Sequence, residues 1–123
     1  MARQIKTIDY DYDNDIFYIS DDETVKTSLD IGDFILDVSH KDFICGIEIM
    51  DASENLGISK ENLMNIKNIK MFVNYKTNHV YVLLVILFKK NEKEVNIQIP
   101  LTLIALQFNS SVKKPKNLTT LFS

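Results

Sequence analysis

The chain has 123 residues, a formal net charge of −3 and one cysteine. A chain of this length usually folds as one domain that buries roughly two-thirds of its unfolded surface, so it needs no disulfide for stability. Cys45 cannot form an internal disulfide, which is typical of a protein in the reducing cytoplasm. The first residues lack the apolar segment of a signal peptide, and the apolar run from Val80 to Phe88 is far shorter than the roughly 20 residues of a membrane-spanning helix. We therefore expect a cytoplasmic protein that does not enter a membrane.

The small net charge conceals a division of the chain. Residues 1–56 contain 14 acidic and 4 basic side chains, whereas residues 57–123 contain 3 acidic and 10 basic ones. Such asymmetry bears on partners and on electrostatic steering, not on the fold. Three interpretations stay open: the two halves lie side by side and largely cancel, the basic half binds nucleic acid or an acidic partner, or the acidic half binds a basic partner.

The first half of the sequence predicts β-structure. Apolar and polar residues alternate with the period of two that indicates a strand, and Asp, Asn and Gly separate the alternating segments. Asp13, Asn14 and Asp15 have the chemistry of a tight turn, and Gly32 marks another turn. Gly46 within an apolar strand predicts a bulge or a close backbone approach. The five predicted strands cover about residues 6–12, 16–19, 25–29, 34–38 and 43–49.

Two short helical pieces are predicted next. Asp51 followed by Glu54 has the spacing of a capping box, which predicts that a helix begins there. Gly57 is suited to end that helix, and Ser59 is suited to cap a second one.

The second half predicts three strands, at about residues 69–75, 80–88 and 95–101. The middle one, Val80 to Phe88, is apolar on both faces, so it should lie at the centre of its sheet and be covered on both sides. The cover is either the domain itself or a partner, because an exposed strand of this kind promotes aggregation. Pro100 should mark the end of the last strand or an edge position. If a partner provides the cover, the side chains of this strand that we expect to bind it are Val82, Leu84, Ile86 and Phe88.

The predicted fold class is mainly β, or α+β. It consists of two antiparallel β-meanders of about five and three strands, joined by a short helical segment and packed in two layers. One β-rich domain spans 1–105, with the acidic meander in 1–56 and the helix plus three-stranded meander in 57–105. A tail follows in 106–123, where three apolar side chains would share one side of a helical turn and dock either on the domain or on a partner. These are Leu118, Leu121 and Phe122.

The sequence contains no recognisable catalytic or metal-binding set. Asp9, Asp11 and Asp13 have the spacing of the first ligands of a calcium loop, but the glycine and the bidentate glutamate of such a loop are missing. His40 and His79 with one cysteine cannot assemble a usual zinc site. Cys45 alternates in phase with apolar neighbours, which indicates a core residue. We therefore predict no catalytic residues, no cofactor and no metal, and we expect that the protein is not an enzyme.

Three segments of the first half follow a family pattern. They are Tyr10-Asp-Tyr-Asp-Asn-Asp-Ile-Phe-Tyr-Ile, Asp33-Phe-Ile-Leu-Asp-Val, and Gly46-Ile-Glu-Ile-Met-Asp-Ala-Ser. In this order they resemble the domain-of-unknown-function 2283 family of short bacterial and archaeal proteins. The resemblance implies a β-rich fold and no established activity. Members of that family sometimes lie beside genes for small toxin-like proteins, so it also implies that an antitoxin-like role is one form the function could take.

Three functional hypotheses follow. The first is a small non-catalytic interaction or regulatory protein, acting with a protein partner or as a homodimer through its sheet edges, the strand around Val80–Phe88 and the tail. The second is a nucleic-acid- or ribosome-associated protein that uses the basic half, although Arg3 is the only arginine and clustered arginines are absent from the sequence. The third is an enzyme with an unrecognised site.

Overall fold

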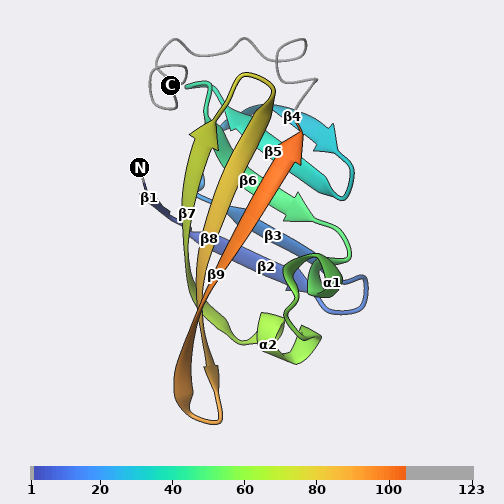
Figure 1. The fold of residues 1–123 in the computed structure, drawn as a ribbon, viewed down its shortest axis with the longest axis vertical. Coiled ribbons are helices and arrows are strands. Elements are labelled where there is room, and N and C mark those ends of the chain that lie inside the picture. The colour runs from blue at the N-terminus through green and yellow to red at the C-terminus, as the bar shows by residue number, and fades with distance from the viewer. Residues whose placement is uncertain (1, 105–123) are drawn as a thin grey trace.

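A computed structural model describes residues 2–104 of the chain. Within this range nine strands form two antiparallel sheets, which pack face to face as two layers (Figure 1). The five-stranded sheet has the order β2-β3-β6-β5-β4. Its strands are β2 (Thr7–Asp11), β3 (Ile16–Ser20), β4 (Val25–Ile31), β5 (Phe34–Ser39) and β6 (Ile44–Ile49). The four-stranded sheet has the order β1-β7-β8-β9, with β1 (Ala2–Gln4), β7 (Ile66–Tyr75), β8 (His79–Lys90) and β9 (Lys93–Ile104).

The predicted fold class is confirmed, and the structure adds two features to it. First, β6 pairs with β3 as well as with β5, so the strand that is buried at five of its six positions occupies the middle of its sheet. This central place gives β6 a hydrogen-bonded neighbour on each side, and Ile44, Ile47 and Ile49 are fully buried. Second, β1 pairs with β7 over residues 2–4, whereas no strand was predicted there.

Local turn chemistry accounts for the hairpins. Asp15, in the turn between β2 and β3, has φ 55°, and Gly32, between β4 and β5, has φ 61°. Asn91 and Glu92 join β8 to β9 with φ values of 51° and 63°. Two consecutive residues with positive φ form the type I′ turn that matches the twist of a hairpin. The turns predicted at Asp15 and Gly32 are therefore confirmed.

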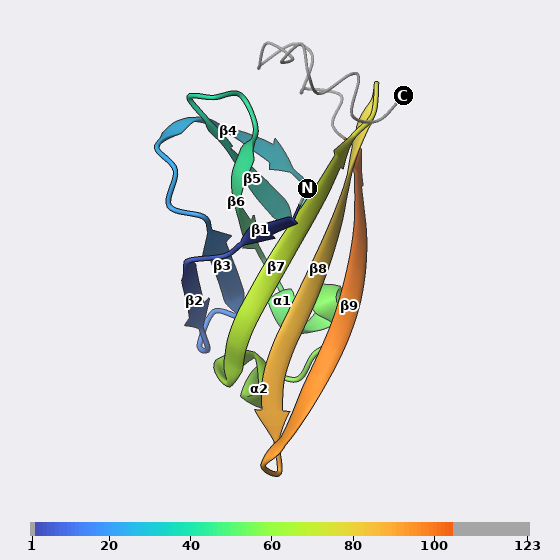
Figure 2. The ribbon, with the colours of Figure 1, turned by 90° about the vertical axis from the view of Figure 1, so that its left-hand side faces the viewer.

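Two helices connect the sheets, α1 (Ala52–Leu56) and α2 (Lys60–Met64). Gly57 ends α1 in the left-handed conformation, and the Ser59 hydroxyl accepts a hydrogen bond from the Asn62 amide (3.2 Å) and caps α2, as predicted. Figure 2 shows α2 beside the part of β7 and β8 that extends beyond the five-stranded sheet, on the inner side of the four-stranded sheet. Leu56, Ile58 and Leu63 are buried there. The helices therefore complete the core where the four-stranded sheet extends beyond the five-stranded one.

The core lies between the two sheets. In β8 burial alternates strictly from Val80 to Phe88, and even-numbered residues point inward. The central position predicted for this strand is confirmed, because β8 lies between β7 and β9. Tyr75 links the layers: its hydroxyl accepts a hydrogen bond from the Ile44 amide of the opposite sheet (2.7 Å). Burial raises the pKa of Tyr75 to about 12, so this phenol remains protonated at neutral pH.

Candidate functional site

One cluster of polar contacts joins the β2–β3 turn to the start of α1. The Asp15 carboxylate accepts hydrogen bonds from the Tyr10 hydroxyl (2.6 Å), the Ser53 hydroxyl (2.6 Å) and the Ser53 amide (3.0 Å). The Asp15 carbonyl accepts a further bond from the Ala52 amide (2.9 Å). Burial opposes ionisation of Asp15, but the hydrogen bonds from Ser53 and Tyr10 prevail, so its pKa lies below the usual value. We call these three residues, Tyr10, Asp15 and Ser53, the first tyrosine–aspartate network.

The first network corrects the predicted capping box. Asp51 precedes α1 in the left-handed conformation (φ 46°, ψ 50°), and its side chain makes no capping hydrogen bond. The backbone amides at the start of a helix need acceptors, and here Asp15 supplies them from a different hairpin. The spacing of Asp51 and Glu54 was therefore misleading, because an acceptor 38 residues away in the sequence occupies the position that a local cap would fill.

A second tyrosine–aspartate network lies on the side of the five-stranded sheet that points away from the core. The Asp37 carboxylate accepts hydrogen bonds from the Tyr18 hydroxyl (2.9 Å) and the Ser28 hydroxyl (2.8 Å). Burial and then this bond to Asp37 raise the pKa of Tyr18. A Cβ atom on Gly46 would lie 3.0 Å from an Asp37 carboxylate oxygen and 3.0 Å from the Ile19 carbonyl oxygen. The predicted close approach at Gly46 is confirmed, and the pairing of β5 with β6 shifts register directly beside it.

Both networks consist of satisfied, mutually bonded groups. Among the described residues, no buried side-chain nitrogen or oxygen lacks a hydrogen-bond partner. In the same part of the chain, no three His, Cys, Asp or Glu side chains are grouped so that they could hold a metal ion. Cys45 is fully buried, and burial together with the nearby Asp21 and Asp37 carboxylates raises its pKa to about 11. Its thiol is therefore protonated and inaccessible, as expected for a core residue.

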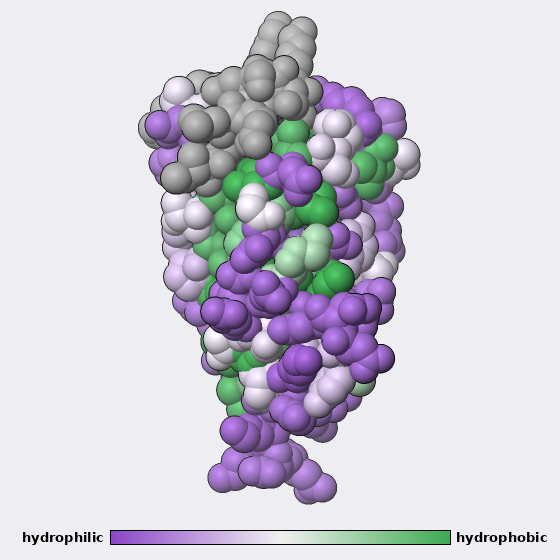
Figure 3. Space-filling view, turned by 90° about the vertical axis from the view of Figure 1, so that its right-hand side faces the viewer, coloured by the Kyte–Doolittle hydropathy of each residue, from purple (hydrophilic) through white to green (hydrophobic). Residues whose placement is uncertain are grey.

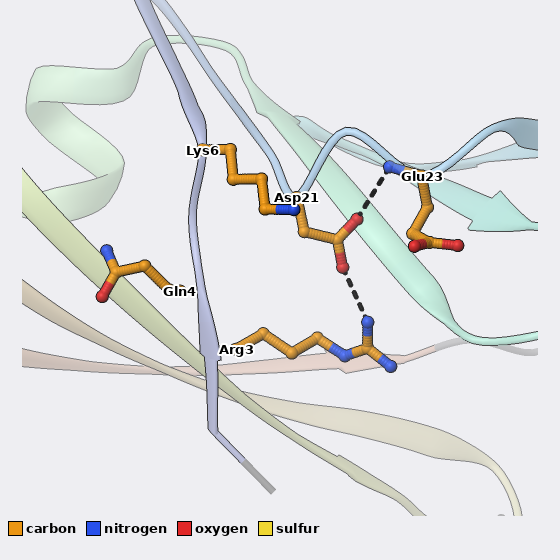
Figure 4. Close-up of a pocket in the computed structure, with 5 residues that line it drawn as sticks. All are labelled: Arg3, Gln4, Lys6, Asp21 and Glu23. Atoms are coloured by element: carbon orange, nitrogen blue, oxygen red, sulfur yellow. Dashed lines mark hydrogen bonds and ion pairs between the residues drawn. The ribbon is translucent and has the colours of Figure 1, made fainter.

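A small pocket lies where β1 and the β3–β4 loop meet. It has a volume of about 230 Å³ and is lined by Arg3, Gln4, Lys6, Asp21 and Glu23 (Figure 4). The Arg3 guanidinium contacts the Asp21 carboxylate (2.7 Å) and lies 3.4 Å from the centroid of the Phe43 ring. Asp21 also accepts a hydrogen bond from the Glu23 amide (3.1 Å). The ion pair between Arg3 and Asp21 therefore fastens β1, an edge strand of the four-stranded sheet, to the loop that follows β3 of the other sheet.

The structure places the side chains of the partner-binding hypothesis inside the core. Their exposed fractions are 0% for Val82, Leu84 and Ile86 and 2% for Phe88. They face the five-stranded sheet and the helices, so a partner cannot reach them in this fold. The other hypothetical contacts, Leu118, Leu121 and Phe122, lie outside the described residues, as does the whole predicted tail, 106–123.

The accessible apolar face of β8 is formed instead by the alternate residues. Tyr81, Leu83, Val85 and Leu87 are half-buried and point away from the core. Beside them on β7 lies Phe72, which is 36% exposed. In Figure 2 no described element lies on the outer side of the four-stranded sheet. We call the outward side chains of β7, β8 and β9 the outer face.

Strand register arranges the outer face in four rows. Each row runs from β7 through β8 to β9. A column of apolar side chains occupies the centre, and mostly amides, hydroxyls and small apolar groups lie beside it. The rows are Asn68–Leu87–Asn96, Lys70–Val85–Gln98, Phe72–Leu83–Pro100 and Asn74–Tyr81–Thr102.

Charged residues gather elsewhere. The turn between β8 and β9 carries Lys89, Lys90 and Lys93, and the tip of this hairpin is hydrophilic in Figure 3. Lys89 lies directly opposite Glu94 across the hairpin, so opposite charges adjoin at the tip. Higher on the side shown in Figure 3, hydrophobic patches alternate with hydrophilic ones along the opening between the sheets. A strong, single-sign basic patch is therefore absent from the described part of this hairpin.

Pro100 lies on the open edge of the four-stranded sheet, one of the two positions predicted for it. In a hairpin with a two-residue I′ turn, the residues that flank the turn, Lys90 and Lys93, bond to each other. By alternation along β9, the backbone groups of even-numbered residues then point away from β8. The amide hydrogen that proline lacks would thus have faced the open edge, where its absence discourages pairing with another strand.

No described helix is long and apolar enough to traverse a bilayer. Two known proteins are similar to part of this chain. A protein of Methanosarcina mazei named "Putative hypoxanthine phosphoribosyltransferase" is 43% identical over 60 residues, which cover 48% of this chain and 49% of that protein. An uncharacterized protein of Methanocaldococcus jannaschii is 35% identical over 66 residues, covering 53% of this chain and 55% of that protein. The chain thus spans about half the length of these curated relatives.

No solved structure matches the chain. The model of one family does match it, over residues 7–53, and that family is described as Protein of unknown function (DUF2283). The matched segment contains every member of both tyrosine–aspartate networks, and the outer face lies beyond it. The resemblance inferred from the motifs is therefore confirmed: residues 7–53 carry the sequence pattern of the DUF2283 family of proteins of unknown function.

Proposed function

We propose that the protein is a non-catalytic interaction module that binds a protein partner through the outer face. The observation that carries this proposal is the apolar column of Tyr81, Leu83, Val85 and Leu87, which no described element covers. Contiguous exposed apolar surface of this kind, bordered by polar residues, is typical of protein-binding sites. The enzyme hypothesis has no comparable observation behind it, because every buried polar side chain of the described residues has a hydrogen-bond partner and no three His, Cys, Asp or Glu side chains there are grouped to hold a metal ion.

The names of the relatives do not alter this proposal. Phosphoribosyl transfer, the activity printed for the Methanosarcina mazei relative, requires a site that binds phosphate groups. Backbone amides of glycine-rich loops commonly supply such a site. Here Gly32 and Gly57 lie singly in two separate turns, and Gly46 lies within β6 beneath Asp37. The relative also matches only half of this chain, so its printed activity supports no proposal here.

An antitoxin-like role is the finer form of the proposal. In that case the outer face would cover a surface that a small toxin-like protein needs for its activity. The ground for this form is the gene neighbourhood that the family resemblance of residues 7–53 implies, and the neutral, apolar character of the outer face suits contact with another protein. Co-expression tests it: the wild-type chain should restore growth of cells that express the toxic partner, and a variant with a charged outer face should not.

The general proposal is tested with three immobilised proteins exposed to an extract of the source organism. They are the wild type, Leu83→Glu at the centre of the outer face, and Val25→Glu, whose valine is 40% exposed in the other sheet. Wild type and Val25→Glu should retain the same protein, and Leu83→Glu should lose it, because a buried unpaired carboxylate opposes binding. Circular dichroism verifies that all three are folded. Equal retention by all three proteins would show that the outer face is not the binding surface.

A further inference from the structure

The four rows of the outer face are almost free of charge, unlike the rest of the chain. Of its twelve outward positions in the four rows, one, Lys70, carries a charge, whereas 25% of the residues in the chain are charged. A strongly charged protein or a nucleic acid would find no complementary charges here. The occupant that this face fits is itself neutral and apolar at the centre, with amides and hydroxyl groups at its margins.

The same face of a second copy has this character, and its rows are complementary to themselves. A two-fold axis along β8 places β8 on β8 and places β7 on β9 of the second copy. Each row then meets the same row reversed: Phe72 faces Pro100 of the second copy, and Lys70 faces Gln98. Asn68 faces Asn96, and both amides can donate and accept hydrogen bonds. No like charges face each other within these four rows, and beyond them the Lys89 side chains of the two copies lie at the axis, each beside the Glu94 opposite it in its own hairpin.

We propose that the outer face binds a second copy of the chain, with a two-fold axis running along β8, to form a face-to-face dimer of four-stranded sheets. This inference rests on the proposed function, since it names the partner of that surface. Two sheets can pack face to face in this way about 10 Å apart. Val85 and Leu83 lie close to the axis, so each approaches its own counterpart.

The size of the face sets the expected affinity. Three strands about 4.8 Å apart, over seven residues that rise about 3.3 Å each, give a projected area of roughly 300–350 Å² per copy, which side-chain relief and the flanking β1 increase. Such an interface lies at or below the lower end of the specific class, where complexes are weak or transient. We therefore expect a dissociation constant of micromolar order, and the measurement must extend to about 200 µM protein.

Sedimentation velocity of the full chain, from about 1 to 200 µM, tests the dimer directly. Val85→Glu and Val85→Lys each place like charges opposite each other at the axis, and each should raise the dissociation constant at least about 30-fold, as for an interface hot spot. An equimolar mixture of the two should recover dimer, because the charges then have opposite sign. Val25→Glu and Val25→Lys are the matched controls and should dimerise as the wild type does.

The outcomes separate this inference from the proposed function. A wild type that is monomeric at every concentration, or a dimer that persists in Val85→Glu, overturns the two-fold arrangement. If the wild type is monomeric yet retains a different protein that Leu83→Glu loses, the second copy is the wrong occupant and the binding function of the face stands. If the two Val85 variants fail to associate when mixed while both are folded by circular dichroism, the axis does not run along β8.

Discussion

Removal of the Asp15 carboxylate should weaken the attachment of α1 to the five-stranded sheet. Asp15→Ala removes the acceptor of three hydrogen bonds, from the Tyr10 hydroxyl, the Ser53 hydroxyl and the Ser53 amide. Loss of a helix-capping acceptor alone costs about 1 kcal/mol. The unsatisfied hydroxyl groups and the left-handed backbone at φ 55°, which alanine tolerates less well than aspartate, each add about 1 kcal/mol. We expect the free energy of unfolding to fall by about 3 kcal/mol, a large part of the 5–15 kcal/mol of a typical domain.

Two further substitutions separate the contributions. Asp15→Asn keeps an acceptor oxygen and the tolerance for the left-handed conformation but removes the charge, so it should lower the free energy of unfolding by about 1–1.5 kcal/mol. Asp13→Ala changes an exposed aspartate of the same turn and should alter stability by less than about 0.5 kcal/mol. Urea denaturation followed by far-ultraviolet circular dichroism measures all three values, provided that the slope with urea concentration stays constant.

The charge contribution has a defined pH dependence. Because the pKa of Asp15 is lowered in the folded protein, its charge stabilises the fold above the pKa of the unfolded chain. That stabilisation disappears as the pH falls through the folded pKa. The difference in stability between wild type and Asp15→Asn should therefore be constant near pH 7 and shrink progressively below about pH 4. If Asp15→Ala were no less stable than Asp13→Ala, the first network would not hold α1 in place, and the structural explanation of the family motif would be wrong.

Four further predictions concern Gly46, Asp51, Tyr75 and the lysines of the β8–β9 hairpin. Gly46→Ala should lower the free energy of unfolding by about 1–3 kcal/mol in urea, because its Cβ would meet Asp37 and the Ile19 carbonyl at 3.0 Å. Asp51→Gly should leave the melting temperature unchanged or raise it, because glycine adopts the left-handed conformation without strain, whereas Asp51→Ala should lower the free energy of unfolding by about 1 kcal/mol. If Asp51→Ala were instead the more stable of the two variants, the side chain of Asp51 would be a helix cap after all. Tyr75→Phe, which leaves the Ile44 amide without its acceptor, should lower stability by about 1–3 kcal/mol, and a neutral result would mean that water replaces the phenol. Finally, we expect no binding of RNA or DNA at physiological salt in fluorescence anisotropy; a sub-micromolar, salt-sensitive affinity lost on replacing Lys89, Lys90 and Lys93 by glutamine would favour the nucleic-acid hypothesis.

Features that depend on neighbouring residues could be predicted from the sequence. The turns at Asp15 and Gly32 follow from residues that adopt positive φ at little cost. The alternation of apolar and polar residues located the strands, because side chains of a strand point to opposite faces in turn. Gly46 could be singled out as a point of close approach for the same local reason, since glycine weakens a strand unless something needs the space above it.

The partners of these elements could not be predicted, because they depend on contacts between distant parts of the chain. β1 is three residues long and has no pattern of its own; the edge of β7, about 70 residues later, provides its hydrogen bonds. The cap of α1 likewise comes from Asp15 in a separate hairpin, whereas local spacing indicated Asp51.

The face of β8 that is accessible was decided only by the tertiary structure. In a strand of alternating apolar and polar residues, the polar ones show which side faces water. Val80 to Phe88 is apolar at every position, so the sequence does not distinguish its buried face from its accessible one. Packing against the five-stranded sheet and α2 placed Val82, Leu84 and Ile86 inside and left Leu83 and Val85 outside. The sequence alone therefore determined that one strand is apolar on both sides, and the fold determined which side the described chain covers itself.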